Sequence, residues 1–268
     1  MATVKSWANQ KGGSGKSILS YNEAFFLAEQ GKKVLYIDAD EQGNGSSSLT
    51  RYATSELVAS DLFQQDAVSP IEIPEDQNLV VVMADDGLIA AERLDVDDVA
   101  MVEILKQNLS QVGQGFDYIV VDTAGSNSRI ANAMLVNSDF VSLPCRIDTF
   151  SIDVAKRVLQ RVVLIQQELN ADLVNLGILP NEFDATHPAQ VQWLSELMTA
   201  FKEYVFPGFI PKRGSYKEAA AEGVPVWRLE SDIDGESTGR VKTSARTAGR
   251  EAKAVFQKML AMMESNNG

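Results

Sequence analysis

The chain has 268 residues, a net charge of −13 and 45% hydrophobic residues, which suits one large α/β domain with a sizeable core. The single cysteine, Cys145, excludes a disulfide framework and a cysteine-rich metal site. No uninterrupted apolar run reaches the roughly 18 residues of a membrane-spanning helix, and no secretory signal peptide precedes the first strand, so we expect a cytoplasmic protein.

The chain opens on a predicted strand, a glycine-rich turn and a predicted helix. The strand covers residues 3–8, the helix covers residues 16–30, and the turn reads K-G-G-S-G-K-S. This order aims backbone N–H groups and the positive end of the helix at one point, where a polyphosphate fits. The general pattern G-x-x-x-x-G-K-[ST] indicates that Lys16 reaches the terminal phosphates and that the Ser17 hydroxyl ligates Mg²⁺. Gln10 stands where that pattern has its first glycine, and Lys11 follows it.

Apolar strand candidates alternate with helical stretches along the rest of the chain. Further strands are predicted at residues 34–38, 79–84, 118–122, 139–144, 174–180 and 205–210. Further helices are predicted at residues 98–111, 128–137, 151–169, 187–202 and 215–222, with a last helix at about 240–263. This alternation is typical of an α/β fold in which helices flank a mostly parallel sheet on both faces. No second domain is visible, so residues 1–268 are predicted to form one domain.

Three aspartates follow or end two of the predicted strands. Asp38 and Asp40 flank Ala39, and because side chains alternate along a strand, both carboxylates point to the same side. Asp122 ends the strand at 118–122. Ligands of open α/β sheets gather at the carboxyl ends of the strands, so we expect these carboxylates beside the phosphates. As a Walker B carboxylate, Asp122 would hold Mg²⁺ through a water.

The C-terminal segment differs in charge from the rest of the chain. From residue 240 onward, six basic residues stand against two acidic ones, a net charge of +4, which leaves −17 on the preceding 239 residues. Residues 231–239, S-D-I-D-G-E-S-T-G, are predicted as a loop before the last helix. In that helix an apolar stripe runs from Ala252 to Met263, and Arg246, Arg250 and Lys253 fall on another face. These basic residues either bind a polyanion or form a solvated face, and charge alone does not decide.

Three motifs carry a family resemblance. The turn K-G-G-S-G-K-S resembles the deviant Walker A motif of the ParA/MinD family of ATPases, which have a P-loop NTPase fold. Residues 38–44, D-A-D-E-Q-G-N, are similar to that family's D-x-D-P-Q-G-N signature, with Glu41 in place of the proline. Residues 116–125, F-D-Y-I-V-V-D-T-A-G, resemble its Walker B strand and switch. With no extension before the first strand, the chain looks most like a short ParA-type partition ATPase.

The resemblance implies ATP and Mg²⁺ as cofactors and an ATP-dependent homodimer. In this family the first lysine of the turn, here Lys11, crosses the dimer interface to the ATP of the partner. The implied catalytic residues are Lys11, Lys16 and Asp40, where Asp40 orients the attacking water. The implied metal site comprises Ser17, Asp38 and Asp122.

The resemblance also extends to the adenine base. The strand ending in Asn181 looks like the family's late strand, whose asparagine hydrogen-bonds the base, and an asparagine offers both a donor and an acceptor. Pro211 lies in a segment that resembles the loop closing over the base. The full set of implied ATP-binding residues is Lys11, Gly12, Gly13, Ser14, Gly15, Lys16, Ser17, Ile18, Asn181 and Pro211.

The implied function is the partition or positioning of a plasmid, a chromosome or another cargo. In such a cycle the ATP-bound dimer binds non-specific DNA over the nucleoid, and a ParB-like adaptor stimulates slow hydrolysis and release. The predicted DNA contacts are Lys212, Arg213, Lys217, Arg240, Lys242, Arg246, Arg250 and Lys253.

Two other classes of function compete with this one. A MinD-like membrane-positioning ATPase is the alternative, because the apolar stripe from Met259 to Met263 suits a lipid interface. The tail from Glu264 to Gly268 is acidic and polar, so no stable membrane association is expected. Relatives that carry an iron–sulfur cluster need paired cysteines, which this chain lacks. A small-molecule ligase needs a pocket for a substrate carboxylate, for which no motif is found.

Overall fold

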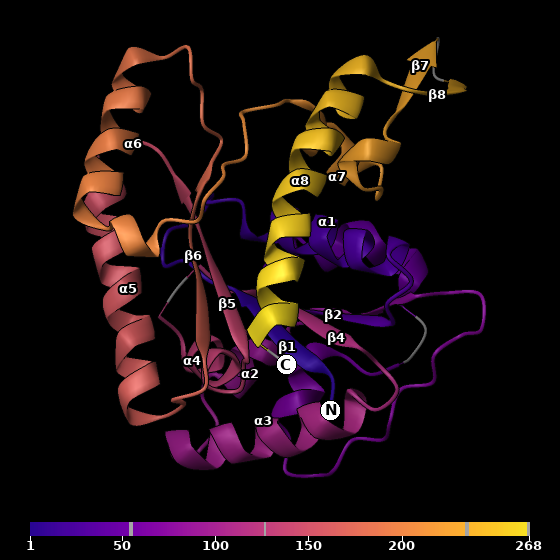
Figure 1. Cartoon of the computed structure of the whole chain (residues 1–268). Coiled ribbons are helices and arrows are strands. Elements are labelled where there is room, and N and C mark those ends of the chain that lie inside the picture. Colours follow the sequence, from indigo (N-terminus) through magenta and orange to yellow (C-terminus); the bar gives the residue numbers. More distant parts are fainter. Residues whose placement is uncertain (54–55, 126, 234–235, 267–268) are drawn as a thin grey trace.

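The core of the protein is a six-stranded parallel sheet, seen in a computed structural model that describes residues 1–53, 56–125, 127–233 and 236–266. The strand order is β3-β2-β4-β1-β5-β6, and each neighbouring pair is parallel. Figure 1 shows β1, β5 and β6 side by side in this sheet. The strands are β1 (Thr3–Trp7), β2 (Val34–Ala39), β3 (Leu79–Val82), β4 (Tyr118–Thr123), β5 (Phe140–Arg146) and β6 (Val174–Asn181). The predicted α/β fold with a mostly parallel sheet is confirmed.

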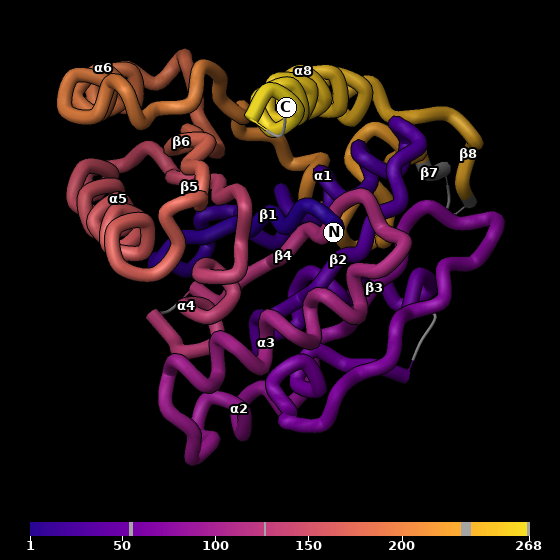
Figure 2. Tube along the Cα trace, turned by 60° about the horizontal axis from the view of Figure 1, so that its bottom comes forward, coloured from indigo at the N-terminus to yellow at the C-terminus, as the bar shows by residue number. Residues whose placement is uncertain are grey.

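Helices cover both faces of this sheet. One face packs against α1 (Lys16–Glu29), α7 (Ser215–Ala221) and α8 (Thr243–Asn266). The other face packs against α2 (Gly87–Ala91), α3 (Asp98–Val112), α4 (Arg129–Val136) and α5 (Ser151–Glu168). The helix α6 (Pro188–Ala200) lies against α5. Figure 2 shows α1 and α8 on one side of the strands and α3 on the other.

Short 3₁₀ helices complete the described chain. They are η1 (Ser46–Tyr52), η2 (Ala59–Phe63), η3 (Lys202–Tyr204) and η4 (Val226–Arg228). None of the helices in the described ranges is both long and apolar enough to cross a membrane.

The strands are apolar because both of their faces are covered. All six residues of β2 and all six residues of β4 are buried, as expected for a sheet between two helical layers. The helices are amphipathic, and their apolar faces pack on these strands. The six predicted helices between residues 16 and 222 each match an observed helix to within two residues at either end.

The predicted strand at residues 205–210 is wrong. Val205 forms a single bridge to β6, and the segment does not continue as a ladder. Pro207 has no N–H to donate, and the N–H of Gly208 turns back to the carbonyl of Phe206 at 2.8 Å. The apolar run therefore contacts β6 through separate backbone hydrogen bonds, from Phe206 to Ile178 and from Ile210 to Pro180, without forming a strand.

The predicted loop at residues 231–239 is also wrong over most of its length. The strands β7 (Glu230–Ile233) and β8 (Glu236–Val241) pair antiparallel in a second sheet. Residues 234–235 of this segment lie outside the described residues. They read D-G in the sequence, a dipeptide strongly preferred in tight hairpins, and that signal was missed.

The last helix begins later than predicted. It starts at Thr243 rather than near residue 240, so Arg240 lies on β8 and Lys242 lies between the strand and the helix. The charge of the C-terminal segment is therefore divided between a hairpin and a helix.

Candidate nucleotide-binding site

The glycine-rich turn joins β1 to α1 at the carboxyl edge of the sheet. Gly13 and Gly15 have φ angles of 73° and 94°, in the left-handed region that favours glycine. A Cβ at Gly15 would also lie 2.2 Å from the Nδ2 atom of Asn181. The first N–H groups of α1 have no partner within the helix, so they are available to an anion.

Two adjoining cavities lie along this turn. The first, of about 590 Å³, is lined by the turn, by Asp40 and Gln42 after β2, and by Gly125 after β4. The second, of about 160 Å³, is lined by Asn181 at the end of β6 and by Pro211. The residues predicted for phosphate and for adenine are thus brought to neighbouring cavities.

Two buried carboxylates end neighbouring strands at this edge. Asp38 and Asp122 are register partners on β2 and β4, and neither is exposed. Asp38 accepts hydrogen bonds from the N–H of Ser46 at 2.7 Å and from the N–H of Asp40 at 3.1 Å. No described residue donates a hydrogen bond to either carboxylate oxygen of Asp122. Burial, and after it the nearby Asp38 carboxylate, raises the pKa of Asp122 well above its usual value.

The surroundings of Asp122 fit a hard cation. The Ser17 hydroxyl and the Lys16 ammonium are near enough to lower its pKa, but neither completes a hydrogen bond to it. A carboxylate beside a hydroxyl is a suitable donor pair for Mg²⁺, which keeps several waters and shares phosphate ligands. Across the described residues, no group of three or more His, Cys, Asp or Glu is arranged to hold a metal. The protein itself therefore offers few metal ligands, which suits Mg²⁺ bound together with a polyphosphate.

Lys16 lies in the interior of the site. It is 6% exposed, and a Cβ placed on Gly125 would come within 3.3 Å of its Nζ atom. Gly125 ends the segment predicted as the switch, so the turn and the switch are in close contact. A side chain at Gly125 would push directly against this ammonium.

Lys11 is paired within its own chain. Its Nζ atom lies 2.7 Å from Oδ2 of Asp148 and 5.8 Å from the centre of the Phe150 ring. The Lys11 N–H donates to Oδ1 of Asn9 at 2.9 Å. The Lys11 side chain is 42% exposed and that of Asp148 is 35% exposed. The amine is therefore accessible from outside the protomer, and its role in a partner remains a prediction.

Asn181 connects β6 to the glycine-rich turn. Its Nδ2 atom donates to the carbonyl of Ser14 at 2.7 Å, and the side chain is 4% exposed. It therefore supports the shape of the turn in addition to lining the second cavity. The predicted contact with adenine has not been tested.

The predicted DNA-binding residues are not equally available. Three of them form ion pairs at 2.7 to 2.8 Å: Arg213 with Glu251, Lys242 with Glu218, and Lys253 with Glu29. Three are exposed and form no ion pair with any described residue: Arg240, Arg246 and Arg250. The remaining two, Lys212 and Lys217, line the second cavity together with Arg213. The acidic partners were missed because each lies far away in the sequence.

Further residues of the first cavity were not singled out from the sequence. Gln42 and Asn44 line it, and both belong to the D-A-D-E-Q-G-N motif, so the motif itself carried the signal. Tyr21 of α1 also lines it, and its buried hydroxyl has no partner among the described residues. No local pattern marks Tyr21, because its place follows from the packing of α1 against α7.

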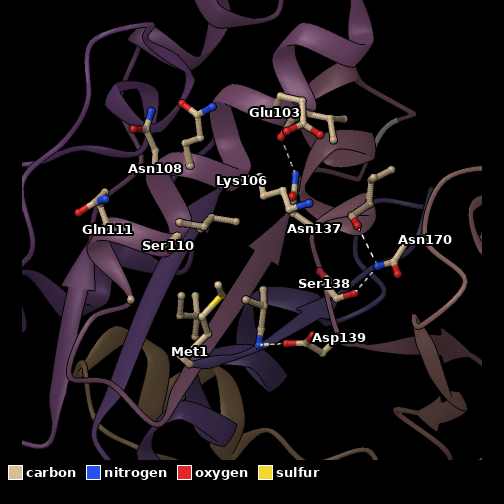
Figure 3. Close-up of a pocket in the computed structure, with 18 of the residues that line it drawn as sticks. Met1, Glu103, Lys106, Asn108, Ser110, Gln111, Asn137, Ser138, Asp139 and Asn170 are labelled. Atoms are coloured by element: carbon tan, nitrogen blue, oxygen red, sulfur yellow. Dashed lines mark hydrogen bonds between the residues drawn. The ribbon is translucent and has the colours of Figure 1, made fainter.

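A wider cavity, of about 700 Å³, lies at the opposite, amino edge of the sheet (Figure 3). Three of its polar side chains, those of Asn137, Asp139 and Asn170, are bonded to nearby backbone. Asn137 donates to the carbonyl of Val102 at 3.1 Å, and Asp139 accepts from the N–H of Val4 at 2.7 Å. Asn170 donates to the carbonyl of Ser138 at 2.9 Å. Because these groups hold the fold together, the cavities beside the turn locate the site better than this wider cavity does.

Comparisons with known proteins agree with the motifs. The family described as an AAA domain matches residues 2–175. IncC of Escherichia coli is 32% identical over 265 residues, which cover 96% of this chain and 69% of IncC. The sporulation initiation inhibitor protein Soj of Bacillus subtilis is 32% identical over 229 residues, covering 84% of this chain and 90% of Soj.

A solved structure supports the same fold. The ATP complex of a McdA variant from Cyanothece superposes with a TM-score of 0.78 at 19% identity and covers 96% of each chain. The matched domain, residues 2–175, includes the P-loop and both aspartate motifs described above. The chain therefore belongs to the ParA/MinD family of P-loop ATPases, enzymes that hydrolyse ATP with Mg²⁺.

Proposed function

We propose that this protein is a ParA-type positioning ATPase. ATP favours a homodimer, the dimer binds DNA without reading its sequence, and a ParB-like adaptor stimulates hydrolysis and release. Membership of the ParA/MinD family supports this proposal. The observation that carries it is the position of Lys11, a partly exposed cation next to Gly12, which lines the phosphate cavity.

In this proposal each residue of the site has a distinct task. The N–H groups of the turn and Lys16 bind the phosphates, and Ser17 and Asp122 hold Mg²⁺ with support from Asp38. Asp40, which lines the first cavity, orients a water. Bound ATP with Mg²⁺ supplies the phosphoryl group and the negative charge that the cations of the site neutralise.

Lys11 must leave Asp148 before it can act in a partner. A partly exposed ion pair of this kind contributes only about 0.2–1 kcal/mol, because water and salt screen it. A triphosphate carries more negative charge than one carboxylate, so it competes well for the lysine. The ion pair between Lys11 and Asp148 suits a protomer without nucleotide. On dimerisation, Lys11 exchanges the Asp148 carboxylate for the triphosphate bound to the partner.

The dimer is tested by sedimentation with a non-hydrolysable ATP analogue and Mg²⁺. We expect Lys11→Ala to remain monomeric, because its partner's phosphates lose a cation. Asp148→Asn should dimerise up to roughly fivefold more tightly, since the competing carboxylate is gone. Lys156→Ala, an exposed change on α5, is the matched control and should behave as the wild type. A Lys11→Ala protein that dimerises normally contradicts the proposal.

The DNA-binding surface is proposed to centre on α8. Arg246 and Arg250 are exposed there, and neither forms an ion pair within the described residues. DNA retardation with ATP should therefore be lost in Arg246→Ala with Arg250→Ala, while dimerisation persists. Lys156→Ala with Arg157→Ala removes the same charge from α5 and serves as the control. If the α8 variant binds DNA as well as the wild type does, α8 is not the DNA surface.

The structure weakens the argument for a MinD-like membrane role. Phe256, Met259 and Met263 of the apolar stripe are each at most 1% exposed, because α8 packs on the sheet. A docked α8 cannot present this stripe to lipid. The stripe, which kept that alternative open, is thus part of the core, and a dimer bound to DNA would be located over the nucleoid.

A further inference from the structure

The two cavities of the nucleotide site meet at three residues. Gly15, Ile18 and Lys217 line both of them. Gly15 and Ile18 belong to the glycine-rich turn and to the first turn of α1, where backbone N–H groups bind phosphate in a P-loop. Lys217 comes from α7, far away in the sequence. The junction therefore has phosphate-binding backbone from one element and an ammonium group from another.

The helix α7 fixes the position of Lys217. Ser215, Tyr216 and Ala219 are at most 6% exposed, and they anchor α7 against the core. The Tyr216 hydroxyl donates to the carbonyl of Ala248 in α8 at 3.3 Å. With both flanks of the helix held, Lys217 projects from a rigid support rather than from a mobile loop.

Lys217 has no anion of its own. Its exposed side chain makes no ion pair or hydrogen bond with any residue in the described ranges. Its neighbour Glu218 is already bonded to Lys242 at 2.7 Å, and Arg213 in the same loop is bonded to Glu251. Lys217 thus differs from Lys242 and Arg213, whose charges are satisfied within the protein.

We propose that Lys217 binds the nucleotide, at the phosphate nearest the sugar. Suppose that the base of a nucleotide occupies the second cavity and that its terminal phosphates contact the turn. The sugar and the phosphate nearest to it must then lie at the junction between the two cavities. The sugar is neutral and the phosphate is an anion, so an unpaired ammonium at the junction pairs with the phosphate. This replaces the predicted DNA contact of Lys217 and depends on nucleotide binding at the P-loop, not on the proposed partition role.

Calorimetric titration with ADP tests this assignment. Lys217→Ala should lose roughly tenfold in ADP affinity, the size expected when one charge-assisted hydrogen bond is removed. Lys217→Arg keeps the charge and should restore most of the affinity. Lys202→Ala is the matched control, because Lys202 is exposed and lines neither cavity.

Two results overturn the proposal. One is an ADP affinity of Lys217→Ala within threefold of the wild type, and the other is an equal loss in Lys202→Ala, which indicates a general effect of removing one positive charge. DNA retardation at nucleotide concentrations that saturate each variant separates the two roles. Lys217→Ala should then bind DNA as the wild type does. If neither the wild type nor any variant binds DNA, the proposed partition function is contradicted. The ADP titration still decides whether Lys217 binds the nucleotide.

Discussion

Asp122 is a buried carboxyl group whose two oxygens have no partner among the described residues. A buried carboxylate without donors or a cation is costly, and a second carboxylate, Asp38, faces it from the neighbouring strand. The two neighbouring carboxyl groups therefore lower the stability of the folded protein when no cation is bound. Binding of a divalent cation would relieve this cost, which links the stability of the protein to occupancy of the site.

Asp122→Asn should raise the free energy of unfolding of the nucleotide-free protein by about 1–3 kcal/mol, because an amide carries no charge to bury. The pKa of Asp122 is higher in the folded protein than the value of 3.8 in the unfolded chain. The resulting loss of stability is complete above the folded pKa, and the stability of the wild type recovers as the pH falls toward 3.8. Urea unfolding without Mg²⁺ should show a larger difference at about pH 8 than at about pH 5. Asp172→Asn, at an exposed position, is the control.

With bound nucleotide, we expect the wild type to gain more stability than Asp122→Asn does. Addition of ATP and Mg²⁺ should stabilise the wild type but leave Asp122→Asn nearly unchanged, since the amide is a poor ligand for the cation. A variant that is less stable than the wild type when empty would contradict this account of Asp122.

Three elements meet at a buried ion pair on the α1 side of the sheet. Lys5 of β1 and Glu23 of α1 are each 1% exposed and bonded to each other. The indole N–H of Trp7 donates to the same Glu23 oxygen at 2.7 Å, and Met259 of α8 lies 3.8 Å from the ammonium. Burial lowers the pKa of Lys5 to about 8, against the opposing effect of Glu23.

Removal of one partner of this pair should be costly. Lys5→Met should destabilise the protein by about 3–5 kcal/mol, because it leaves Glu23 buried and poorly compensated. The double variant Lys5→Met with Glu23→Gln should recover most of this loss, since glutamine still accepts from the Trp7 indole. Urea unfolding of the wild type, both single variants and the double variant measures the coupling. Equally small losses in both single variants would show that the pair is dispensable.

The ion pair also predicts a pH dependence. Between about pH 8 and pH 10.5 the unfolded chain keeps the Lys5 proton that the folded chain has released. The unfolding free energy of the wild type should therefore rise with pH in this window, relative to the Lys5→Met and Glu23→Gln double variant. The comparison cancels contributions of tyrosines and of Cys145, which both proteins share.

The first third of α8 contains a glycine with a packing role. A Cβ at Gly249 would lie 2.4 Å from the Cβ of Trp227 and 2.9 Å from its Cα, so η4 rests directly on the α8 backbone. Gly249→Ala gains about 1 kcal/mol in helix propensity but forces these elements apart. We expect a net loss of about 1–3 kcal/mol in thermal or urea unfolding. Gln257→Ala, at an exposed site on the same helix, should be nearly neutral, and a stabilised Gly249→Ala would contradict the close packing.

At the scale of the whole molecule, charge separates into an acidic body and a basic C-terminal segment. The first 239 residues carry −17 and the remainder carries +4. An acidic body repels DNA, so binding should be confined to the basic segment and should depend on ionic strength.

The salt dependence of DNA binding tests this arrangement. The slope of log Kd against log salt concentration reflects the number of phosphates contacted, with about 0.9 per contact. Arg246→Ala with Arg250→Ala should reduce the slope by about 2, if weak binding remains measurable at low salt. The control pair on α5, Lys156→Ala with Arg157→Ala, should leave the slope unchanged. An equal reduction of the slope in the control pair would mean that DNA binding depends only on the net charge of the protein.

Local patterns were sufficient to predict most of the sheet, most of the helices and the place of the glycine-rich turn between β1 and α1. The turn from Lys11 to Ser17 is contiguous, and its conformation depends on glycines within it. Asp38 and Asp122 could be placed together because parallel strands end at a common edge. Local pattern failed at residues 205–210, where Pro207 and Gly208 outweighed an apolar run.

The sequence by itself determined the chemistry of this protein: a phosphate-binding turn, two strand-end carboxylates and an α/β order of elements. Only the tertiary structure decided which charges are free. Lys253 is bonded to Glu29, 224 positions away, and Lys11 is bonded to Asp148, 137 positions away. A motif depends on neighbours along the chain, whereas an ion pair depends on which distant surfaces packing brings together. That is why the P-loop was readable in advance, whereas the availability of each basic residue was not.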